Sequence, residues 1–437
     1  MLTQQESRVQ VKDYGTFKDS LRAPVHRWFQ YPAGYSYKFI EAKAKEYRLA
    51  ASSWVLDPFV GCGTTCVTLK QLGINSIGIE AHPFVYWVAK TKLYWEFDLS
   101  NLHADIERFW RSVLEGINHG QVSFADTKSL PPLVHKCFSQ DNLSKLVFLR
   151  DTIERFASDE HTKDLLRLAL TATLRLASRA GAGWPYIAPS RYHEKHEQEA
   201  FSTFYRLVGQ MYQDLLYITA RAVPQDTQCL LIQGDARDHH PTIPPSSIDL
   251  VITSPPYLNN YDYADRTRLE MYFFGWASSW RDITQNVRAR LITAATTQIT
   301  GNNAEQVRVL RPDIKHIAPL VYADLNERVQ QLARIRVTKG GKKRYDLMII
   351  GYFNDMFLVL RRIYDVLKPG HDFVLVLGDS APYGVHIPTE IYLGELAKGL
   401  GYSSYKVELL RTRGDKWAHN PQRHKVPLKE CVLTITK

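Results

Sequence analysis

A short motif in the second half of the chain combines a hydroxyl group, two rigid prolines and an aromatic ring. The apolar run 247–252 is followed directly by Thr253-Ser254-Pro255-Pro256-Tyr257. The run predicts a buried strand, and because proline cannot donate to a sheet ladder, the two prolines should take the chain out of the sheet. Ligands of open α/β sheets bind outside the carboxyl ends of the strands. We therefore expect Ser254 and Tyr257 at the rim of a crevice, although an ordinary strand-ending turn explains the five residues about as well.

A glycine-rich turn nearer the N-terminus has the features of a phosphate- or nucleotide-binding loop. A predicted strand, 53–56, leads into Asp57-Pro58-Phe59-Val60-Gly61-Cys62-Gly63-Thr64-Thr65, and a helical pattern, 66–72, follows. Glycines let the backbone approach a ligand, and a helix N-terminus offers unpaired N–H groups. The next predicted strand ends in Glu80, about 20 residues further on, where the dinucleotide fold has an acid that binds ribose. This order favours a nucleotide-like cofactor over a purely structural turn, although Cys66 replaces the third glycine.

Two regions interrupt the alternation of strands and helices. Residues 100–225 contain helical patterns at 102–117, 143–156, 163–179 and 201–222, which predict a helical insertion or a separate subdomain. Residues 281–344 have no regular pattern and end in a basic run, so we expect an irregular basic insertion. The predicted division is 1–99 for the N-terminal arm and the first part of the core, 100–225 for the helical insertion, and 226–437 for the second part of the core.

The remaining elements are expected to complete one sheet. A helix is predicted at 36–48 with Ser36 as its cap, a further helix at 345–367 and a strand at 373–377. The last two strands, 406–411 and 431–436, are joined by a polar loop and should form an antiparallel hairpin at the end of the sheet.

Composition restricts the class of protein. The net charge of +10 favours a polyanionic partner, although charge alone is weak evidence. No apolar run approaches the ~18 residues that span a bilayer, and we expect an intracellular protein. The five scattered cysteines predict neither a disulfide framework nor a zinc site. The histidine pairs His193/His196 and His419/His424 are expected to be exposed and to bind no metal.

Basic and aromatic residues recur in three loops that are candidate nucleic-acid contacts. Guanidinium and ammonium groups neutralise phosphates, and aromatic rings stack on bases. A loop between two helices explains the first of these segments equally well. The candidate contacts are Arg179, Trp184, Arg191, Tyr261, Tyr263, Arg266, Lys342, Lys343 and Arg344.

Together the two motifs resemble those of amino-group DNA methyltransferases, which use S-adenosylmethionine. The glycine turn matches the cofactor motif of that family, Thr253–Tyr257 matches its catalytic motif, and residues 29–40 resemble its additional cofactor-binding motif. The resemblance covers roughly residues 20–100 and 226–437. It implies a Rossmann-like, seven-stranded α/β sheet with helices on both faces and an antiparallel last strand, and it suggests that 100–225 recognises the target. The implied cofactor-binding residues are Phe29, Tyr31, Asp57, Pro58, Phe59, Gly61, Gly63, Thr64, Thr65, Glu80 and Asp235.

The resemblance also implies the chemistry. An exocyclic amine is a poor nucleophile because its lone pair is delocalised into the ring, and acceptors on its N–H groups can localise that pair. The Ser254 hydroxyl and the Pro255 carbonyl would be these acceptors, Pro256 would stiffen the turn, and Tyr257 would stack on a flipped base. Phe59 could face the cationic sulfonium. Neither a metal nor a covalent intermediate is needed.

The target base and the partners are narrower expectations. In this family Ser-Pro-Pro-Tyr is usual for N4 of cytosine, whereas Asp- or Asn-Pro-Pro-Tyr is usual for N6 of adenine, so Ser254 favours cytosine, with adenine as the alternative. Methylation at carbon 5 is disfavoured because no cysteine follows a proline. Less favoured are an RNA base methyltransferase, a nicotinamide-dependent oxidoreductase and a catalytically silent nucleic-acid-binding protein. The expected partner is double-stranded DNA in a prokaryotic or phage-like cytoplasm, with a cognate restriction endonuclease or another defence-system component as a candidate partner.

Overall fold

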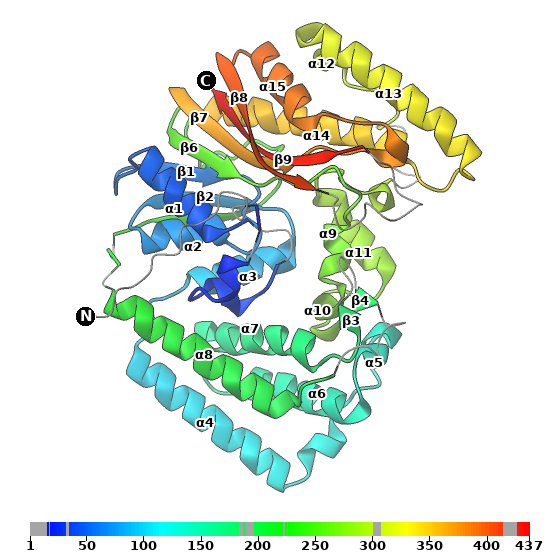
Figure 1. Cartoon of the computed structure of the whole chain (residues 1–437). Helices are drawn as coiled ribbons and strands as arrows, with labels where there is room; N and C mark the ends of the chain where they lie inside the picture. The colour runs from blue at the N-terminus through cyan, green and yellow to red at the C-terminus, as the bar shows by residue number, and fades with distance from the viewer. Residues whose placement is uncertain are drawn as a thin grey trace.

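The chain forms an open seven-stranded sheet with helices on both faces (Figure 1), which confirms the predicted α/β fold. The order of the strands is β5-β2-β1-β6-β7-β9-β8. The strands from β5 to β7 are parallel, and β9 is antiparallel to both of its neighbours. The structure is a computed structural model and describes residues 15–16, 18–31, 35–182, 187–188, 196–221, 223–224, 226–299, 307–413 and 426–437.

The strands follow the predicted positions closely. The predicted C-terminal hairpin is confirmed, and its second strand, β9, lies between β7 and β8. The direction in which strands are added to the sheet reverses between β1 and β6, where an open α/β sheet leaves a crevice. The strands are β1 (Trp54–Asp57), β2 (Asn75–Glu80), β5 (Cys229–Gln233), β6 (Ile248–Thr253), β7 (Leu367–Gly378), β8 (Ser404–Arg413) and β9 (Leu428–Thr436). A separate two-stranded ribbon pairs β3 (Gly181–Ala182) with β4 (Ile187–Ala188).

Consecutive residues of a strand pack into the hydrophobic clusters on opposite faces of the sheet, because successive side chains point to opposite faces. Val55 of β1 packs in a cluster with α1, whereas the adjacent Leu56 packs in the cluster beneath α14 and α15. Ser36 caps α1 by accepting from the Lys38 backbone N–H at 3.3 Å, as predicted. The first face carries α1 (Tyr37–Glu46), α2 (Thr64–Gln71) and α3 (Pro83–Leu93), and the second carries α14 (Tyr345–Val366) and α15 (Thr389–Gly399).

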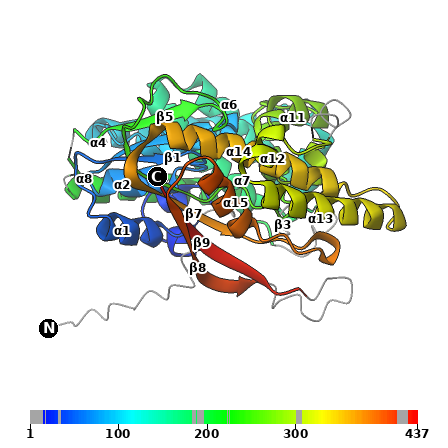
Figure 2. The ribbon, with the colours of Figure 1, turned by 90° about the horizontal axis from the view of Figure 1, so that it is seen from above.

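The prediction that 281–344 is irregular is wrong for much of this segment. It contains the 20-residue helix α13 (Pro319–Thr338), which packs on α14 and projects beyond the sheet in Figure 2. Only Val321, Leu325 and Leu332 of α13 are buried, so the apolar stripe is too narrow to give a clear helical pattern. The same segment contains most of α11 (Trp280–Asn286) and all of α12 (Pro312–Ile317).

The helical insertion is confirmed, but it shares its core with the sheet. One continuous cluster joins Phe84 of α3 and Val67 of α2 to the buried residues of the inserted helices. Figure 1 shows these helices as a layer below α3. The insertion comprises α4 (Leu99–Asn118), α5 (Pro132–Cys137), α6 (Gln140–Arg155), α7 (Glu160–Ala177) and α8 (Ala200–Ala220).

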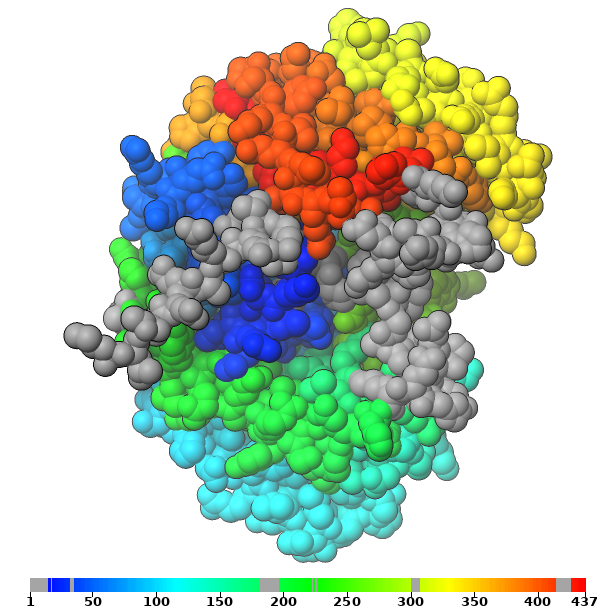
Figure 3. Space-filling model, in the orientation of Figure 1, coloured from blue at the N-terminus to red at the C-terminus, as the bar shows by residue number. Residues whose placement is uncertain are grey.

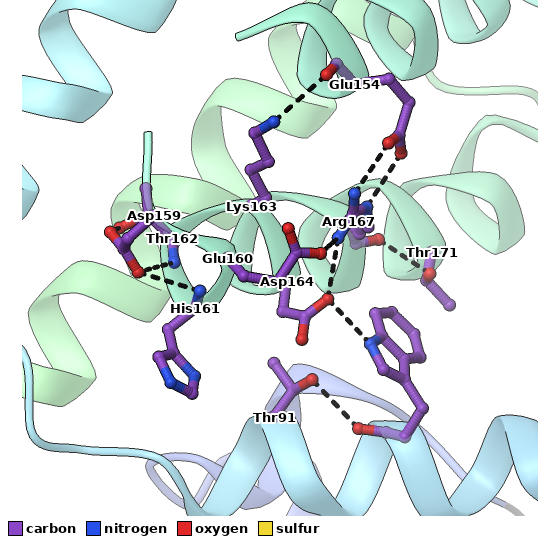
Figure 4. Close-up of polar contacts among 11 residues, drawn as sticks. Thr91, Glu154, Asp159, Glu160, His161, Thr162, Lys163, Asp164, Arg167 and Thr171 are labelled. Atoms are coloured by element: carbon purple, nitrogen blue, oxygen red, sulfur yellow. Dashed lines mark hydrogen bonds and ion pairs between the residues drawn. The ribbon is translucent and has the colours of Figure 1, made fainter. Parts of the chain in front are cut away.

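Hydrogen bonds and ion pairs join α7 to α3 of the core and to α6 (Figure 4). The Trp87 indole N–H of α3 donates to Asp164 Oδ1 at 3.0 Å. On the other side of Asp164, Arg167 donates to the same oxygen at 3.0 Å and to both carboxylate oxygens of Glu154 on α6 at 2.8 and 2.7 Å. The insertion is therefore fixed to α3 by directional bonds as well as by apolar packing.

Within the described residues, no helix is long and apolar enough to cross a membrane, and no group of His, Cys, Asp or Glu is arranged to hold a metal. All five cysteines are described, and each is a free thiol.

A buried ion pair holds the segment that follows the Thr253–Tyr257 motif. This segment includes α9 (Tyr263–Arg266) and α10 (Arg268–Phe273). Arg288 Nε donates to Asp262 Oδ2 at 2.8 Å, and the two side chains are only 2% and 3% exposed. The Arg288 guanidinium also lies 3.9 Å from the ring centroid of Trp280. Removing one member of such a pair leaves an uncompensated buried charge.

We predict that Arg288→Met lowers the free energy of unfolding by about 3–5 kcal/mol, because Asp262 would stay buried without its partner. Arg281→Met is the matched control, since Arg281 is exposed on α11 and should change stability by less than about 0.5 kcal/mol. Urea denaturation of both variants measures the difference. Equal midpoints for the two variants would contradict the structural role of the pair.

Candidate active site

A crevice opens at the carboxyl ends of β1, β2, β5 and β6, where the direction of strand addition reverses. The empty space within it is about 860 Å³, part of which is open to solvent. The structure brings most of the predicted cofactor-binding and catalytic residues together here. Of the predicted residues, Tyr31, Asp57, Pro58, Phe59, Gly61, Thr64, Thr65, Glu80, Asp235, Ser254, Pro256 and Tyr263 line the crevice.

Four predicted site residues lie next to the crevice but do not line it. Phe29 is buried behind it, with its ring centroid 6.4 Å from that of Tyr31. Gly63 is the N-cap residue of α2, and Pro255 is buried. Tyr257 is half-buried, and its hydroxyl bonds Glu430 of β9. These residues can shape the site, but the first three do not present a side chain to a ligand.

Asp57 ends β1 as a buried carboxylate, and both of its oxygens accept hydrogen bonds. Its Oδ1 accepts from the Thr253 hydroxyl at 2.5 Å and from the Phe59 N–H at 3.0 Å. Its Oδ2 accepts from the hydroxyls of Thr65 and, at 3.2 Å, Tyr35. Burial raises the pKa of Asp57, and the hydrogen bonds offset part of this rise. Asp57 therefore joins β1, α2, β6 and the start of α1.

The glycine turn leaves backbone donors facing the crevice. Gly61 and Gly63 have φ values of +55° and +91°, which residues with side chains rarely adopt. A side chain at position 61 would also point toward the Tyr31 ring, because the position of its Cβ lies 4.0 Å from Tyr31 Cδ1. No side chain caps the N-terminus of α2, so its first N–H groups are available to an anionic group of a ligand.

Glu80 is held with its carboxylate at the edge of the crevice. Its Oε2 accepts from the Gly61 N–H at 2.9 Å, and its Oε1 accepts from the His82 N–H at 2.8 Å. Burial raises the pKa of Glu80 to about 7, although these backbone hydrogen bonds oppose the rise. Each oxygen keeps a lone pair that could accept from a ligand hydroxyl.

Asp235 follows β5 and is paired with a cation. Arg237 Nε donates to both of its oxygens at 2.9 and 3.0 Å, and Arg237 also donates to Asp355 at 2.7 Å. The carboxylate of Asp235 is therefore fixed at the rim by a charged network. Its predicted contact with a ligand would use its remaining lone pairs.

The Thr253–Tyr257 motif leaves β6 at the opposite wall. The backbone N–H of Tyr257 donates to the Tyr263 hydroxyl at 3.3 Å, and the Tyr257 hydroxyl donates to Glu430 Oε1 at 2.9 Å. The guanidinium of Arg413 lies 5.6 Å from the Tyr257 ring centroid. Burial, together with the neighbouring Glu430 carboxylate, raises the pKa of Tyr257. The motif is thus held rigidly, with Ser254 and Pro256 facing the crevice.

Comparison with known proteins agrees with this geometry. Residues 11–97 match the N6/N4 family model described as DNA methylase. The chain is 24% identical to the type II methyltransferase M.BsoBI of Geobacillus stearothermophilus over 430 residues, which cover 89% of this chain and 81% of that protein. It is 23% identical to the type II methyltransferase M.AvaI of Nostoc sp. over 443 residues, which cover 97% and 88% of the two chains.

These similarities support an amino-group DNA methyltransferase. A 48-residue stretch is also 46% identical to the type II methyltransferase M.MjaII of Methanocaldococcus jannaschii, although it covers only 11% of this chain. Methyltransferases of this family use S-adenosylmethionine, and the crevice has the donor and acceptor groups that such a cofactor requires.

Sequence reasoning missed several residues of the methyltransferase crevice. Tyr35 lies within the segment that resembles the additional cofactor motif, and its hydroxyl bonds Asp57. His82 follows Glu80, and burial lowers its pKa to about 3, so it is neutral near pH 7. Residues 290–292 also line the crevice, but they come from a segment without a regular pattern and gave no signal.

The predicted nucleic-acid contacts fall into different environments in the methyltransferase. Tyr261 is 2% exposed and packs against Tyr263, so we remove it from the candidate DNA contacts. Arg179, Tyr263 and Arg266 are half-buried, and Arg266 donates to the Gln30 carbonyl at 3.4 Å. Lys342 and Lys343 are exposed and Arg344 is half-buried, so these three remain predicted DNA contacts. Trp184 and Arg191 lie outside the described residues. The same is true of three histidines of the predicted pairs, His193, His419 and His424.

The raised pKa of Glu80 predicts that cofactor affinity increases with pH. Only the ionised carboxylate accepts freely from ribose hydroxyls, and with a pKa of about 7 its ionised fraction rises about tenfold between pH 6 and 8. We therefore expect the dissociation constant of S-adenosylmethionine to fall by up to about tenfold over this range. Isothermal titration calorimetry measures it.

Glu80→Gln is the control for this prediction, because it removes the titrating group while the cofactor's own amino group still titrates. The variant should bind more weakly and lose most of the pH dependence. The same pH dependence in both proteins would show that Glu80 is not its source.

Proposed function

We propose that this methyltransferase transfers a methyl group from S-adenosylmethionine to the exocyclic N4 of a cytosine that is flipped out of duplex DNA. The observation that carries the proposal is the convergence of Ser254 and Pro256 with the glycine turn and Glu80 in one crevice. The catalytic motif and the cofactor motif are almost 200 positions apart, yet Thr253 and Asp57 bond each other directly. The type II methyltransferases among its relatives support a site-specific enzyme of a restriction–modification system.

The residues around the crevice fit the cofactor. Glu80 would accept from the ribose hydroxyls, Asp235 would face the adenine, and the uncapped N-terminus of α2 would bind the carboxylate. Tyr31 and Phe59 offer aromatic rings that suit a cationic sulfonium. When bound, S-adenosylmethionine supplies an electrophilic methyl group. The protein must therefore hold the target amine in line with it and keep water out.

The motif at the end of β6 would activate the amine. The Ser254 hydroxyl and the Pro255 carbonyl would accept from the two N–H groups, so that the lone pair is localised on nitrogen. The rings of Pro255 and Pro256 limit the backbone, and the bond from the Tyr257 N–H to Tyr263 fixes the turn. Transfer would leave a positively charged amine, which then loses one proton. Tyr257 would stack on the flipped base.

Ser254 supports cytosine as the target, because an uncharged serine hydroxyl is usual where this family methylates N4. Adenine N6 is the alternative. A mass-spectrometric analysis of nucleosides from duplex DNA incubated with labelled S-adenosylmethionine separates the two. Labelled N4-methylcytosine supports the proposal. Labelled N6-methyladenine would show that the target base is adenine and not cytosine, and label found only in RNA would overturn the proposal.

The stacking role of Tyr257 predicts different effects for two substitutions. Tyr257→Ala removes the ring and should lower kcat by about 10²-fold or more. Tyr257→Phe keeps the ring and loses the interactions of the hydroxyl with Glu430 and Ser254, so we expect a loss of less than about tenfold. Single-turnover methylation of duplex DNA measures both rates.

Cofactor affinity serves as the control for these variants, because Tyr257 does not line the crevice. Both variants should bind S-adenosylmethionine as the wild-type chain does. Normal turnover by Tyr257→Ala would exclude the stacking role.

A further inference from the structure

The segment that carries Phe29 and Tyr31 enters the site through a strained turn. Val25 has φ +64° and ψ −45°, and its side chain is fully buried. β-Branched residues rarely adopt positive φ, so the surrounding contacts must impose this conformation. The short 3-10 helix η3 (His26–Trp28) follows at once and leads to Phe29. The position of this turn therefore determines where Tyr31 lies in the wall of the crevice.

One carboxylate of the helical insertion holds the turn. Asp214 lies on α8, and its side chain is 2% exposed. Its Oδ2 accepts from the Val25 N–H at 3.0 Å, from Arg27 Nε at 3.0 Å and from the Trp28 indole N–H at 2.9 Å. Its Oδ1 accepts from Arg27 Nη2. In Figure 3 the dark-blue N-terminal segment lies directly against the green atoms of α8.

The far side of the same segment is held by α9, the short helix that follows the Thr253–Tyr257 motif. Arg266 donates to the Gln30 carbonyl at 3.4 Å. Arg175 of α7 in turn donates to the Arg266 carbonyl at 2.5 Å and to Glu270 Oε2 at 2.7 Å. The segment 25–31 is thus held between α8 and the end of α9, which α7 fixes in turn. Both α7 and α8 belong to the insertion.

We propose that Asp214 is a positioning residue for the cofactor site, so that the helical insertion holds in place the segment whose Tyr31 lines the S-adenosylmethionine crevice. This inference rests on the proposed function. Without the Asp214 carboxylate, Val25 would relax from its positive φ, Trp28 would lose its acceptor, and Tyr31 would leave its place against Gly61. The insertion therefore supports the cofactor site from behind without lining it, whatever it contributes to recognition of DNA.

Asp164 provides a matched control within the same insertion. It also accepts from a tryptophan indole of the core, Trp87, at 3.0 Å, and it also pairs with an arginine, Arg167 (Figure 4). Its hydrogen bonds go to Trp87 and Arg167 and not to the segment 25–31, and neither Asp164 nor Trp87 lines the cofactor crevice. Loss of this contact should loosen the insertion in a comparable way without moving Tyr31.

The test compares Asp214→Asn with Asp164→Asn in the full-length protein. Asp214→Asn should raise the Kd and the KM for S-adenosylmethionine by about tenfold or more, while kcat at saturating cofactor and the KM for DNA change by less than about threefold. Asp164→Asn should leave the Kd for the cofactor within about twofold of wild type. Calorimetry gives the Kd, and steady-state kinetics give the other constants.

Arg27→Gln is a second variant in case Asp214→Asn does not fold. It removes the ion pair but keeps the bonds from Val25 and Trp28, so it should raise the Kd in the same direction by a smaller factor. Equal Kd values for the two aspartate variants would overturn the inference alone, and so would a wild-type Kd in Arg27→Gln if Asp214→Asn does not fold. Failure of the wild-type chain to bind S-adenosylmethionine would overturn the proposed function, and the inference with it.

Discussion

The site depends on one buried carboxylate. Asp57 accepts from Thr253, Thr65, Tyr35 and the Phe59 N–H, and these donors come from four different parts of the chain. Burial of an ionised carboxylate is costly unless its oxygens accept hydrogen bonds, and here both do. Because Thr253 immediately precedes Ser254, the proposed catalytic serine, the carboxylate that shapes the glycine turn also fixes the end of β6. The two motifs are therefore one structural unit.

The layers around this unit explain how distant segments reach the crevice. The parallel strands bring the carboxyl ends of β1, β2, β5 and β6 to one edge, and the reversal in strand order opens space between them. The inserted helices share a continuous core with α2 and α3, so they brace the side of the crevice that the N-terminal segment forms. Tyr263 and residues 290–292 line another side of the crevice, and the buried pair of Asp262 and Arg288 joins the segments that carry them.

Local signals made the fold and much of the site predictable from sequence. The glycine turn, Glu80 and the Ser-Pro-Pro-Tyr motif each carry their information within a few residues, and the structure brings them together. Asp214 and Glu430 gave no signal, because their roles depend on partners far along the chain, Val25 and Tyr257. The helix α13 was missed because only three of its side chains are buried. Tyr261 was misjudged because polar tyrosine-rich loops are usually exposed, whereas this one folds back on the core.

The most direct test of the account is the single-turnover rate of methyl transfer by Asp57→Asn at saturating S-adenosylmethionine. If Asp57 holds both motifs, the substitution disturbs the end of β6 as well as the glycine turn. The account predicts that the rate stays at least about tenfold below that of the wild-type chain even when the cofactor is saturating. A wild-type rate under these conditions would show that Asp57 serves the cofactor alone and would contradict the claim that the two motifs form one unit.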